Sequence, residues 1–327
     1  MIKIQFLIGD RGTEITEPNP ILKYRFEDYG IKITDKNPDI LFVHSRIYPK
    51  VASISTPKVI IERADSAILY HNHIREAINK RDVLSVIKTT KLRDEKLHNS
   101  TVYSGRYHCK IINDIINFGV NEKQNFKIDP SNFSKIKCLI PTSVQDRFYS
   151  YKNIKIEKKI YDMMFVGNIC YNHIKKPNVL NWHRKTLTEK LLKLKKRYKI
   201  FLYTETNGKQ TLDPKIYQQV LSQSKICLSP WGMGEWNYRD FESMYTKTVL
   251  VKPNSNHVIC YPVDIFNNNK MYIPCSPDFC DLEYILEMII LNYNKTKDML
   301  EANRKILLDS WDINKLTYDF SSFIKNL

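Results

Sequence analysis

The sequence predicts an α/β protein of two domains, each with a parallel sheet covered by helices. The chain has 327 residues, which is more than one typical domain holds. Short apolar runs of strand length alternate with segments of helical periodicity, and this alternation restarts after a lysine-rich, apolar-poor link at residues 151–159. We therefore assign a first domain to residues 1–153, a second to 154–305, and a C-terminal helix that returns to the first domain to 306–327.

In the first domain, four apolar runs have the length and composition of buried strands. We expect these strands at residues 2–8, 40–44, 59–62 and 138–141. Between the third and the fourth run, apolar residues over 67–79 recur with helical spacing, which predicts a helix there.

In the second domain, the same criterion predicts strands at residues 161–166, 200–203, 226–229 and 249–251. Between the first two, Leu187, Leu191, Leu194 and Tyr198 fall on one face of a helix. The other face of this helix holds Arg184, Lys185, Lys190, Lys193, Lys195, Lys196 and Arg197. Two interpretations of that basic face stay open, a solvated surface or a phosphate-binding or membrane-binding patch.

The charge and the cysteines restrict the class of protein. The net charge of +16 favours anionic partners. Residues 1–153 hold 25 basic and 17 acidic side chains and the rest of the chain holds 26 and 18, so each part carries +8 and there is no separate basic arm. The seven cysteines form no C-x-x-C pair, the N-terminus lacks the layout of a signal peptide, and no apolar run approaches a membrane span. We therefore expect a cytoplasmic protein with reduced thiols.

Several common motifs do not occur. The chain has neither a G-x-x-x-x-G-K-[ST] nor a G-x-G-x-x-G sequence, which removes the usual nucleotide loops. No two aspartates stand two positions apart, and Cys170 with His173 or Cys275 with Cys280 lack partner pairs at zinc spacing. We therefore predict neither a metal nor a resident cofactor.

The most informative stretch is residues 224–253. A buried strand breaks at Ser229-Pro230 and opens into a loop with Gly232 and Gly234 before the next helix. Such a strand-to-helix turn presents backbone N–H groups and the positive end of a helix dipole, which suit a diphosphate.

The helix after this loop begins with a charged pair. Asn237 is a plausible N-cap, and Arg239 and Glu242 stand three apart on one face. Arg239 could contact a phosphate, and Glu242 could accept hydrogen bonds from two ribose hydroxyls. The alternative is an ordinary surface ion pair between these two residues.

This region resembles the donor-binding region of GT-B glycosyltransferases, most closely the exostosin-like and spore-coat CgeB-like groups. In these groups a strand ending in proline leads through a glycine loop to an Arg and a Glu, as residues 217–253 do here. The preceding run YDMMFVGN, with Arg184 in the helix after it, is similar to the opening of the same domain.

The resemblance implies two Rossmann-like domains facing a cleft, with a nucleotide-sugar donor bound by the second. The donor-binding residues it implies are Gly167, Asn168, Arg184, Tyr203, Pro230, Gly232, Gly234, Tyr238, Arg239 and Glu242. In many retaining members two glutamates have seven residues between them, whereas Glu235 and Glu242 here have six. We therefore expect an inverting rather than a retaining transfer.

An inverting transfer needs a base in the first domain to take the proton of the acceptor hydroxyl. Three candidates stand at the ends of predicted strands: His44, Glu62 and Asp65. Asp65 is our first choice, and its alternative role is to cap the helix that begins near residue 67.

We thus predict a metal-independent hexosyl- or pentosyltransferase of glycan biosynthesis that uses a nucleotide-sugar donor and a glycan, glycoprotein or lipid-linked acceptor. Peripheral contact with an anionic membrane is a further open alternative. Two other functions also stay open: a basic nucleic-acid-binding protein, and an inactive GT-B scaffold that only binds carbohydrate. Nucleic acid is not our expected partner, because the chain has no RRM, KH or zinc signature.

Overall fold

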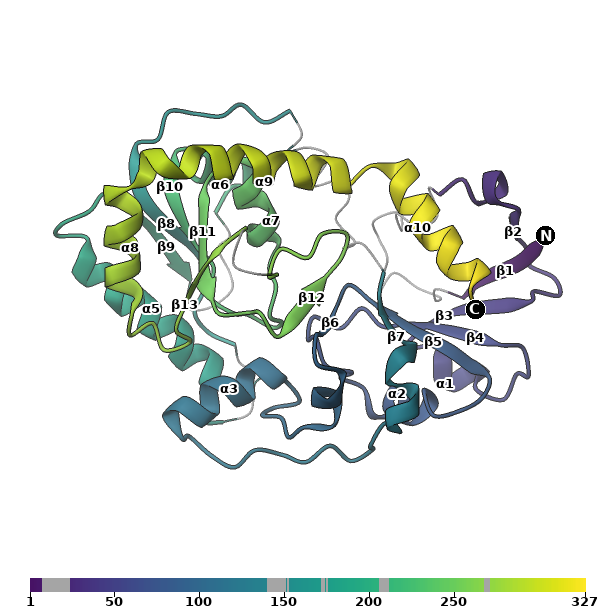
Figure 1. Ribbon diagram of the computed structural model, residues 1–327. Coiled ribbons are helices and arrows are strands. Elements are labelled where there is room, and N and C mark those ends of the chain that lie inside the picture. Colours follow the sequence, from purple (N-terminus) through teal and green to yellow (C-terminus); the bar gives the residue numbers. More distant parts are fainter. Residues whose placement is uncertain are drawn as a thin grey trace.

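The computed structural model describes residues 1–7, 24–139, 151, 153–171, 174, 176–205, 212–267 and 271–327. Two parallel sheets lie side by side, with helices packed around them (Figure 1). The predicted α/β class with two Rossmann-like sheets is confirmed.

The first sheet has the strand order β2-β1-β3-β4-β5-β7, and every pairing in it is parallel. Its strands are β1 (Ile2–Leu7), β2 (Ile31–Ile33), β3 (Ile40–His44), β4 (Lys58–Ile61), β5 (Val83–Lys88) and β7 (Ile136–Cys138). The strand predicted at 40–44 is confirmed, and those at 2–8 and 59–62 agree apart from their ends; residue 8 lies outside the described residues. The strand predicted at 138–141 begins earlier, as β7, and shares only Cys138 with the prediction; residues 140 and 141 lie outside the described residues.

Strand β5, a central strand of this sheet, was not predicted, because polar residues interrupt its apolar pattern. Both polar side chains are buried and hydrogen-bonded. Ser85 Oγ donates to the carbonyl of Lys135 at 2.6 Å, and Lys88 Nζ donates to Glu62 Oε2 at 2.8 Å. Buried polar groups are tolerated when they are hydrogen-bonded in this way.

The second sheet has the order β13-β11-β10-β8-β9, again with only parallel pairings. Its strands are β8 (Tyr161–Asn168), β9 (Ile200–Glu205), β10 (Ser224–Leu228), β11 (Val249–Pro253) and β13 (Ile273–Cys275). All four predicted strands occur here, and β13 was missed. A small antiparallel pair, β6 (Thr90–Leu92) with β12 (Val258–Cys260), joins the two halves of the chain.

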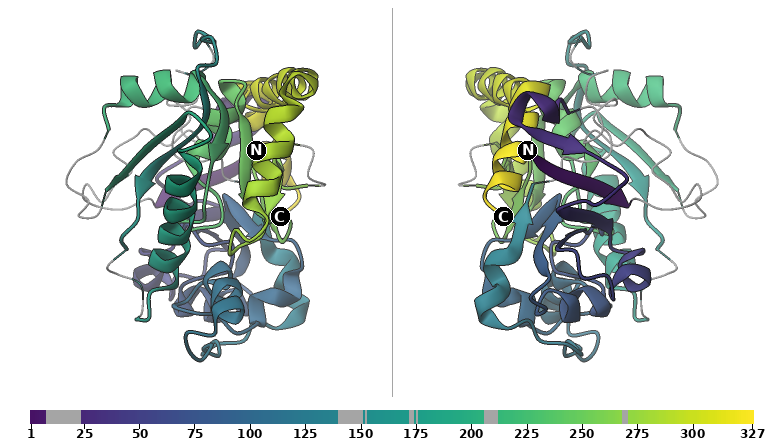
Figure 2. Two further views of the ribbon diagram at one scale, coloured as in Figure 1. Left: turned by 90° about the vertical axis from the view of Figure 1, so that its left-hand side faces the viewer. Right: turned by 90° about the vertical axis from the view of Figure 1, so that its right-hand side faces the viewer.

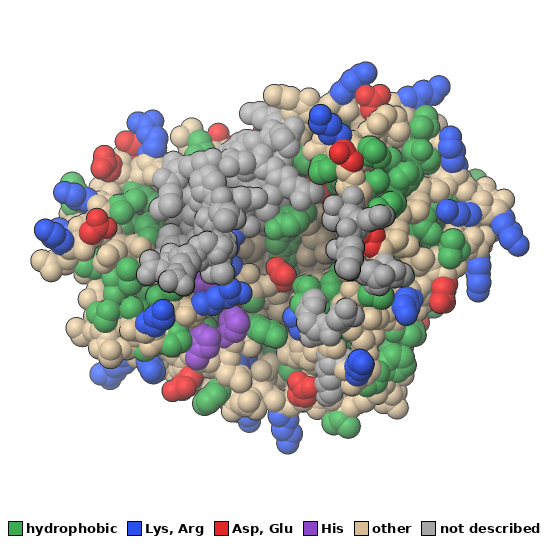
Figure 3. Space-filling model, turned by 180° about the vertical axis from the view of Figure 1, so that it is seen from behind, with side chains coloured by type: hydrophobic (Ala, Val, Ile, Leu, Met, Phe, Trp, Pro, Cys, Tyr) green, Lys and Arg blue, Asp and Glu red, His purple; other side chains and the backbone are tan. Residues whose placement is uncertain are grey.

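The α-helices are α1 (Tyr48–Val51), α2 (Asn72–Ala77), α3 (Tyr107–Ile116), α5 (Val179–Leu194), α6 (Pro214–Ser222), α7 (Tyr238–Tyr245), α8 (Leu282–Leu291), α9 (Lys297–Ser310) and α10 (Ile313–Lys325). Helix α5 buries Leu187, Leu191 and Leu194 as predicted, whereas Tyr198, predicted on the same face, lies beyond the end of the helix and is partly buried. Basic side chains are spread widely over the face shown in Figure 3 instead of forming one patch. In the part of the chain that the structure describes, no helix is long and apolar enough to cross a membrane.

The helix predicted over 67–79 begins only at Asn72, so its predicted start was wrong. Backbone N–H groups before that point donate to side chains of other elements. The N–H of Ala67, for example, donates to Glu235 Oε2 at 2.8 Å. Asp65 consequently lies well before the helix, and its alternative role as an N-cap is wrong; the N-cap position belongs to His71.

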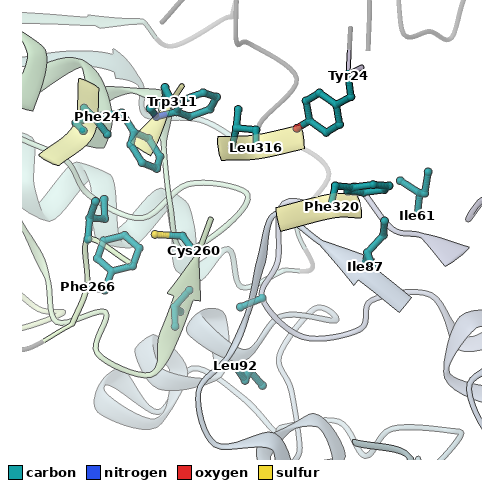
Figure 4. Close-up of a cluster of buried hydrophobic side chains, with 14 of the residues drawn as sticks. Tyr24, Ile61, Ile87, Leu92, Phe241, Cys260, Phe266, Trp311, Leu316 and Phe320 are labelled. Carbon is teal, nitrogen blue, oxygen red and sulfur yellow. The ribbon is translucent and has the colours of Figure 1, made fainter. Parts of the chain in front are cut away.

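The C-terminal helix α10 lies against the first sheet (Figure 2, right). The ring of Phe320 packs on Phe42, Phe26 and Tyr24, with centroids 5.6, 5.8 and 5.9 Å apart. Figure 4 shows the hydrophobic cluster around it, which continues to Phe241 of α7 and Phe266 in the second half of the chain. One core therefore extends across both halves.

Helix α3 belongs to the first half of the sequence but packs against α5. Cys109 and Ile112 of α3 share a buried cluster with Val179 and Leu180 of α5 and with Trp231 after β10. This contact brings the segment around α3 up to the β10–α7 loop.

Candidate active site

A cavity of about 600 Å³ lies at the carboxyl ends of β8 and β9 and beside the β10–α7 loop. Ligands of open α/β sheets bind at this edge. The lining residues from the second domain are Val166, Gly167, Asn168, Tyr171, Arg184, Tyr203, Glu205, Leu212, Tyr217, Met233, Gly234, Trp236, Asn237, Tyr238, Arg239 and Glu242. From the first domain, Asp65 completes the wall.

Two arginines converge on the floor of this cavity. A Cβ atom placed on Gly167 would lie 3.4 Å from Arg239 Nη2 and 3.6 Å from Arg184 Nη1. Both guanidinium groups also lie over the ring of Phe165, at 5.5 and 5.6 Å from its centroid. The two guanidinium groups thus approach the backbone of Gly167, which has no side chain, at the end of β8.

Arg184 is 4% exposed, although the helical pattern had placed it on the basic outer face. Its Nη1 donates to Asn168 O at 2.6 Å and to Tyr171 Oη at 2.7 Å. Its Nε–H has no hydrogen-bond partner among the described residues. Burial, together with Arg239, lowers the pKa of Arg184 to about 10, while Tyr171 acts in the opposite direction. The surroundings therefore hold a cation that lacks a carboxylate partner within the described structure.

Arg239 lies at the start of α7. Its Nη2 donates to the carbonyl of Val166, and its Nη1 to that of Leu228 at 3.4 Å. Burial lowers the pKa of Arg239, but Tyr217 and Glu242 are among the neighbours that raise it overall.

Glu242 is 1% exposed and lies one turn further along α7. The hydroxyl of Tyr217, on α6, donates to Glu242 Oε2 at 2.7 Å. This bond orients the carboxylate toward the cavity that both residues line. Sequence reasoning missed Tyr217 as a site residue, although it stands at the start of the run that resembles the donor-binding region.

The sequence predicted that the amino end of α7 is open to a bound anion, but in the structure an acidic side chain caps it. The Asp240 carboxylate accepts from the N–H of Asn237 at 2.8 Å and lies 3.2 Å from Lys252 Nζ. This acidic cap takes part of the anion-binding capacity of the helix end. The arginine pair, more than the helix dipole, therefore supplies the positive charge at the end of β8.

Asp65 meets the β10–α7 loop at Gly234. A Cβ atom on Gly234 would lie 2.0 Å from the carbonyl oxygen of Asp65, so only glycine permits this approach. Asp65 is accessible from the cavity, but the surrounding protein partly desolvates its carboxyl group and raises its pKa, against the opposing effect of Arg106.

The other two base candidates do not line the cavity. Glu62 is fully buried and forms an ion pair with Lys88 at 2.8 Å. His44 lies at the end of β3, where burial and the nearby Arg63 and Arg46 lower its pKa to about 4.

Pro230 and Gly232 also lie outside the lining. They shape the loop instead: Pro230 O accepts from Asn237 Nδ2 at 3.0 Å, and Gly232 O lies 3.0 Å from His108 Nε2. The predicted donor residues Gly167, Asn168, Tyr203, Gly234 and Tyr238 do line the cavity, as the two arginines and Glu242 do.

In the described residues, no group of three or more His, Cys, Asp or Glu side chains is arranged to hold a metal ion. The aromatic side chains of Tyr203, Trp236 and Tyr238 give the cavity apolar faces beside its charges. Of these, sequence reasoning missed Trp236, which lies between the glycine loop and α7.

No known protein family and no curated protein sequence matches the chain. Among solved structures, a glycosyltransferase from Rickettsia africae is similar at a TM-score of 0.49 and 12% identity, over 99% of this chain and 98% of that one. TarM of S. aureus gives a TM-score of 0.44 at 12% identity over 86% of this chain, which spans about half (53%) of TarM. UDP-GlcNAc 2-epimerase from Methanocaldococcus jannaschii gives 0.39 at 10% identity over 100% of both chains. Likenesses at this level assign no function, so the function rests on the site itself.

Proposed function

We propose that this protein is a glycosyltransferase of the GT-B type, which binds a nucleotide sugar in the cavity and transfers the sugar to an acceptor hydroxyl. The observation that carries the proposal is the Arg184–Arg239 pair at the end of β8. A buried cation without a carboxylate partner costs free energy unless a bound anion compensates it. The diphosphate of a nucleotide sugar would supply that anion.

The rest of the cavity suits the remainder of such a donor. Glu242 can accept hydrogen bonds from ribose hydroxyls while Tyr217 holds its other oxygen. Tyr203, Trp236 and Tyr238 offer aromatic faces against which a base can stack. These features favour a nucleotide over inorganic phosphate alone.

Asp65 supports transfer rather than binding alone, since it lies in the same wall and has a raised pKa. In the proposed reaction the bond from the anomeric carbon to the diphosphate oxygen breaks, and a bond to the acceptor oxygen forms. The acceptor proton goes to Asp65, and the two guanidinium groups stabilise the charge on the leaving diphosphate. Attack from the side opposite the leaving group inverts the anomeric centre.

The acceptor we propose is a glycan, a glycoprotein or a lipid-linked sugar, with a hexose or a pentose transferred. Nucleic-acid binding is not favoured, because the basic side chains are dispersed over the surface in view in Figure 3.

A thermal-shift screen against UDP, GDP, dTDP and CMP sugars tests the proposal. A ligand at 100 times its Kd adds about 2.7 kcal/mol of stability, which shifts the melting temperature measurably. Transfer or hydrolysis of the stabilising donor would then separate an enzyme from an inactive scaffold, and isomerisation of the free donor would indicate an epimerase instead. Stabilisation by random oligonucleotides but by no nucleotide sugar would contradict the proposal.

Glu242→Ala is expected to weaken nucleotide binding by about 1.5–3 kcal/mol, roughly tenfold or more, through loss of charge-assisted hydrogen bonds. Calorimetry with UDP and with 2′-deoxy-UDP checks it. The wild-type protein should prefer the ribonucleotide, and the variant should lose that preference. An unchanged preference in a folded variant would move the ribose away from Glu242.

Transfer is expected to continue in excess EDTA, because the arginine pair supplies the positive charge that a metal would otherwise bring. Turnover measured before and after chelation, then with added Mg²⁺ or Mn²⁺, checks this. Loss of turnover on chelation, with recovery on adding metal, would contradict this prediction and show that a bound cation also stabilises the leaving diphosphate.

A further inference from the structure

A buried ion pair joins the two domains beside the cavity. Glu235, in the β10–α7 loop, and His108, on α3, are both fully buried, and Nδ1 of His108 lies 3.3 Å from Glu235 Oε1. The second carboxylate oxygen accepts from the N–H of Ala67 at 2.8 Å, and His108 Nε2 lies 3.0 Å from Gly232 O. The pair therefore ties the donor-side loop to the segment that follows β4.

The carbonyl oxygen of Gly232 can only accept, so His108 carries a proton on Nε2 in that contact. Nδ1 lies at ion-pair distance from Glu235 Oε1, although these two atoms do not form a hydrogen bond. Burial lowers the pKa of His108, but Cys109 and Glu235 raise it to about 10 overall. Burial raises the pKa of the Glu235 carboxyl group, but His108 outweighs this effect and lowers the pKa to about 2. Both shifts favour the charged forms, the imidazolium of His108 and the carboxylate of Glu235.

The atoms held by this pair adjoin Asp65. Ala67, whose N–H Glu235 accepts, is two residues from Asp65, and Gly234, next to Glu235, lies against the Asp65 carbonyl. Arg106 adds a third link, since its Nε donates to Met233 O at 3.0 Å. Glu235 itself is absent from the cavity lining, so it is not placed to touch a donor.

We propose that Glu235 and His108 are positioning residues whose ion pair holds Asp65 against the donor-side loop and so sets the place of its carboxylate relative to the sugar donor. The inference rests on the proposed function. It gives Glu235 a role that the glutamate spacing left open: it orients the base from outside the cavity.

Glu235→Gln tests this with little change in shape. Turnover should fall about tenfold or more, because a misplaced base loses its near-attack geometry, while the Kd for UDP stays within about twofold. The matched control is Asp82→Asn, which breaks the ion pair with the buried Lys58 inside the first domain, away from the cavity lining. At a comparable loss of melting temperature, Asp82→Asn should leave turnover unchanged.

Epistasis separates positioning from a merely structural role. In an Asp65→Asn background, Glu235→Gln should cost no further turnover, because the base it positions is already lost. Gly234→Ala, which pushes the Asp65 carbonyl away without changing a charge, should reproduce the loss of turnover. Full turnover in folded Glu235→Gln, or an equal loss with and without Asp65, would overturn the proposal.

The role of the ion pair can also be tested if the proposed function is wrong. If the wild-type protein neither binds nucleotides nor turns over a donor, amide hydrogen exchange still tests the contact: Glu235→Ala should speed exchange of the Ala67 N–H, which donates to Glu235 Oε2, and Asp82→Asn should not. Unchanged exchange at Ala67 would overturn the role of the pair in holding the segment around Asp65.

Discussion

Asp65→Asn is expected to lower turnover about 100-fold while donor affinity stays within about twofold. Asparagine keeps the shape of the side chain but cannot accept the acceptor's proton. The backbone contact with Gly234 does not involve the carboxylate, so the loop and the donor site should be preserved. Steady-state kinetics with calorimetry of UDP binding separates the two quantities.

The pH profile gives this prediction a second readout. The base must be deprotonated, and desolvation raises the pKa of Asp65 above that of an ordinary aspartate. Turnover should therefore be full above the raised pKa and fall as the pH drops through it, and this acidic limb should disappear in the variant. If Asp65→Asn is active and His44→Gln or Glu62→Gln is not, the role of base passes to that residue. If all three are active, the inverting mechanism is wrong.

Arg184→Met is expected to weaken UDP binding about 10- to 100-fold, the loss of one charge-assisted hydrogen bond to a phosphate or somewhat more. Methionine retains the apolar contact with Phe165 but removes the guanidinium that faces Gly167. Calorimetry at two salt concentrations checks it, and the remaining affinity of the variant should depend less on salt.

Arg197→Met is the matched control for Arg184→Met. Arg197 lies just beyond the end of α5, half exposed and paired with Glu283 and Glu287 of α8. The same chemical change there should leave UDP affinity unaltered, because surface ion pairs contribute little and this one is remote from the cavity lining. Equal losses in both variants would mean that net charge, and not the arginine pair, governs nucleotide binding.

Local patterns determined the parts of this protein that could be predicted from the sequence. Apolar runs gave strands β3, β8 and β11 and the buried face of α5, because burial of a strand or helix face leaves its period in nearby residues. The order of strand, glycine loop, Arg239 and Glu242 likewise lies within one short segment. That segment contributes seven of the sixteen lining residues that come from the second domain.

Tertiary structure alone decided the contacts between distant segments. Ala67 and Glu235 are 168 positions apart, and no local spacing reveals that the carboxylate of one element accepts from the backbone of the other. The same contact keeps Ala67 out of the predicted helix, which begins only at Asn72, so Asp65 has no capping role. Lys88 forms a buried ion pair with Glu62, which no local spacing indicates. The packing of α5 likewise buries Arg184 beside Arg239. The burial and the charged neighbours of a side chain depend on the elements that pack against it. The burial and charge of the residues in this cavity are therefore decided by how the two halves of the chain pack together.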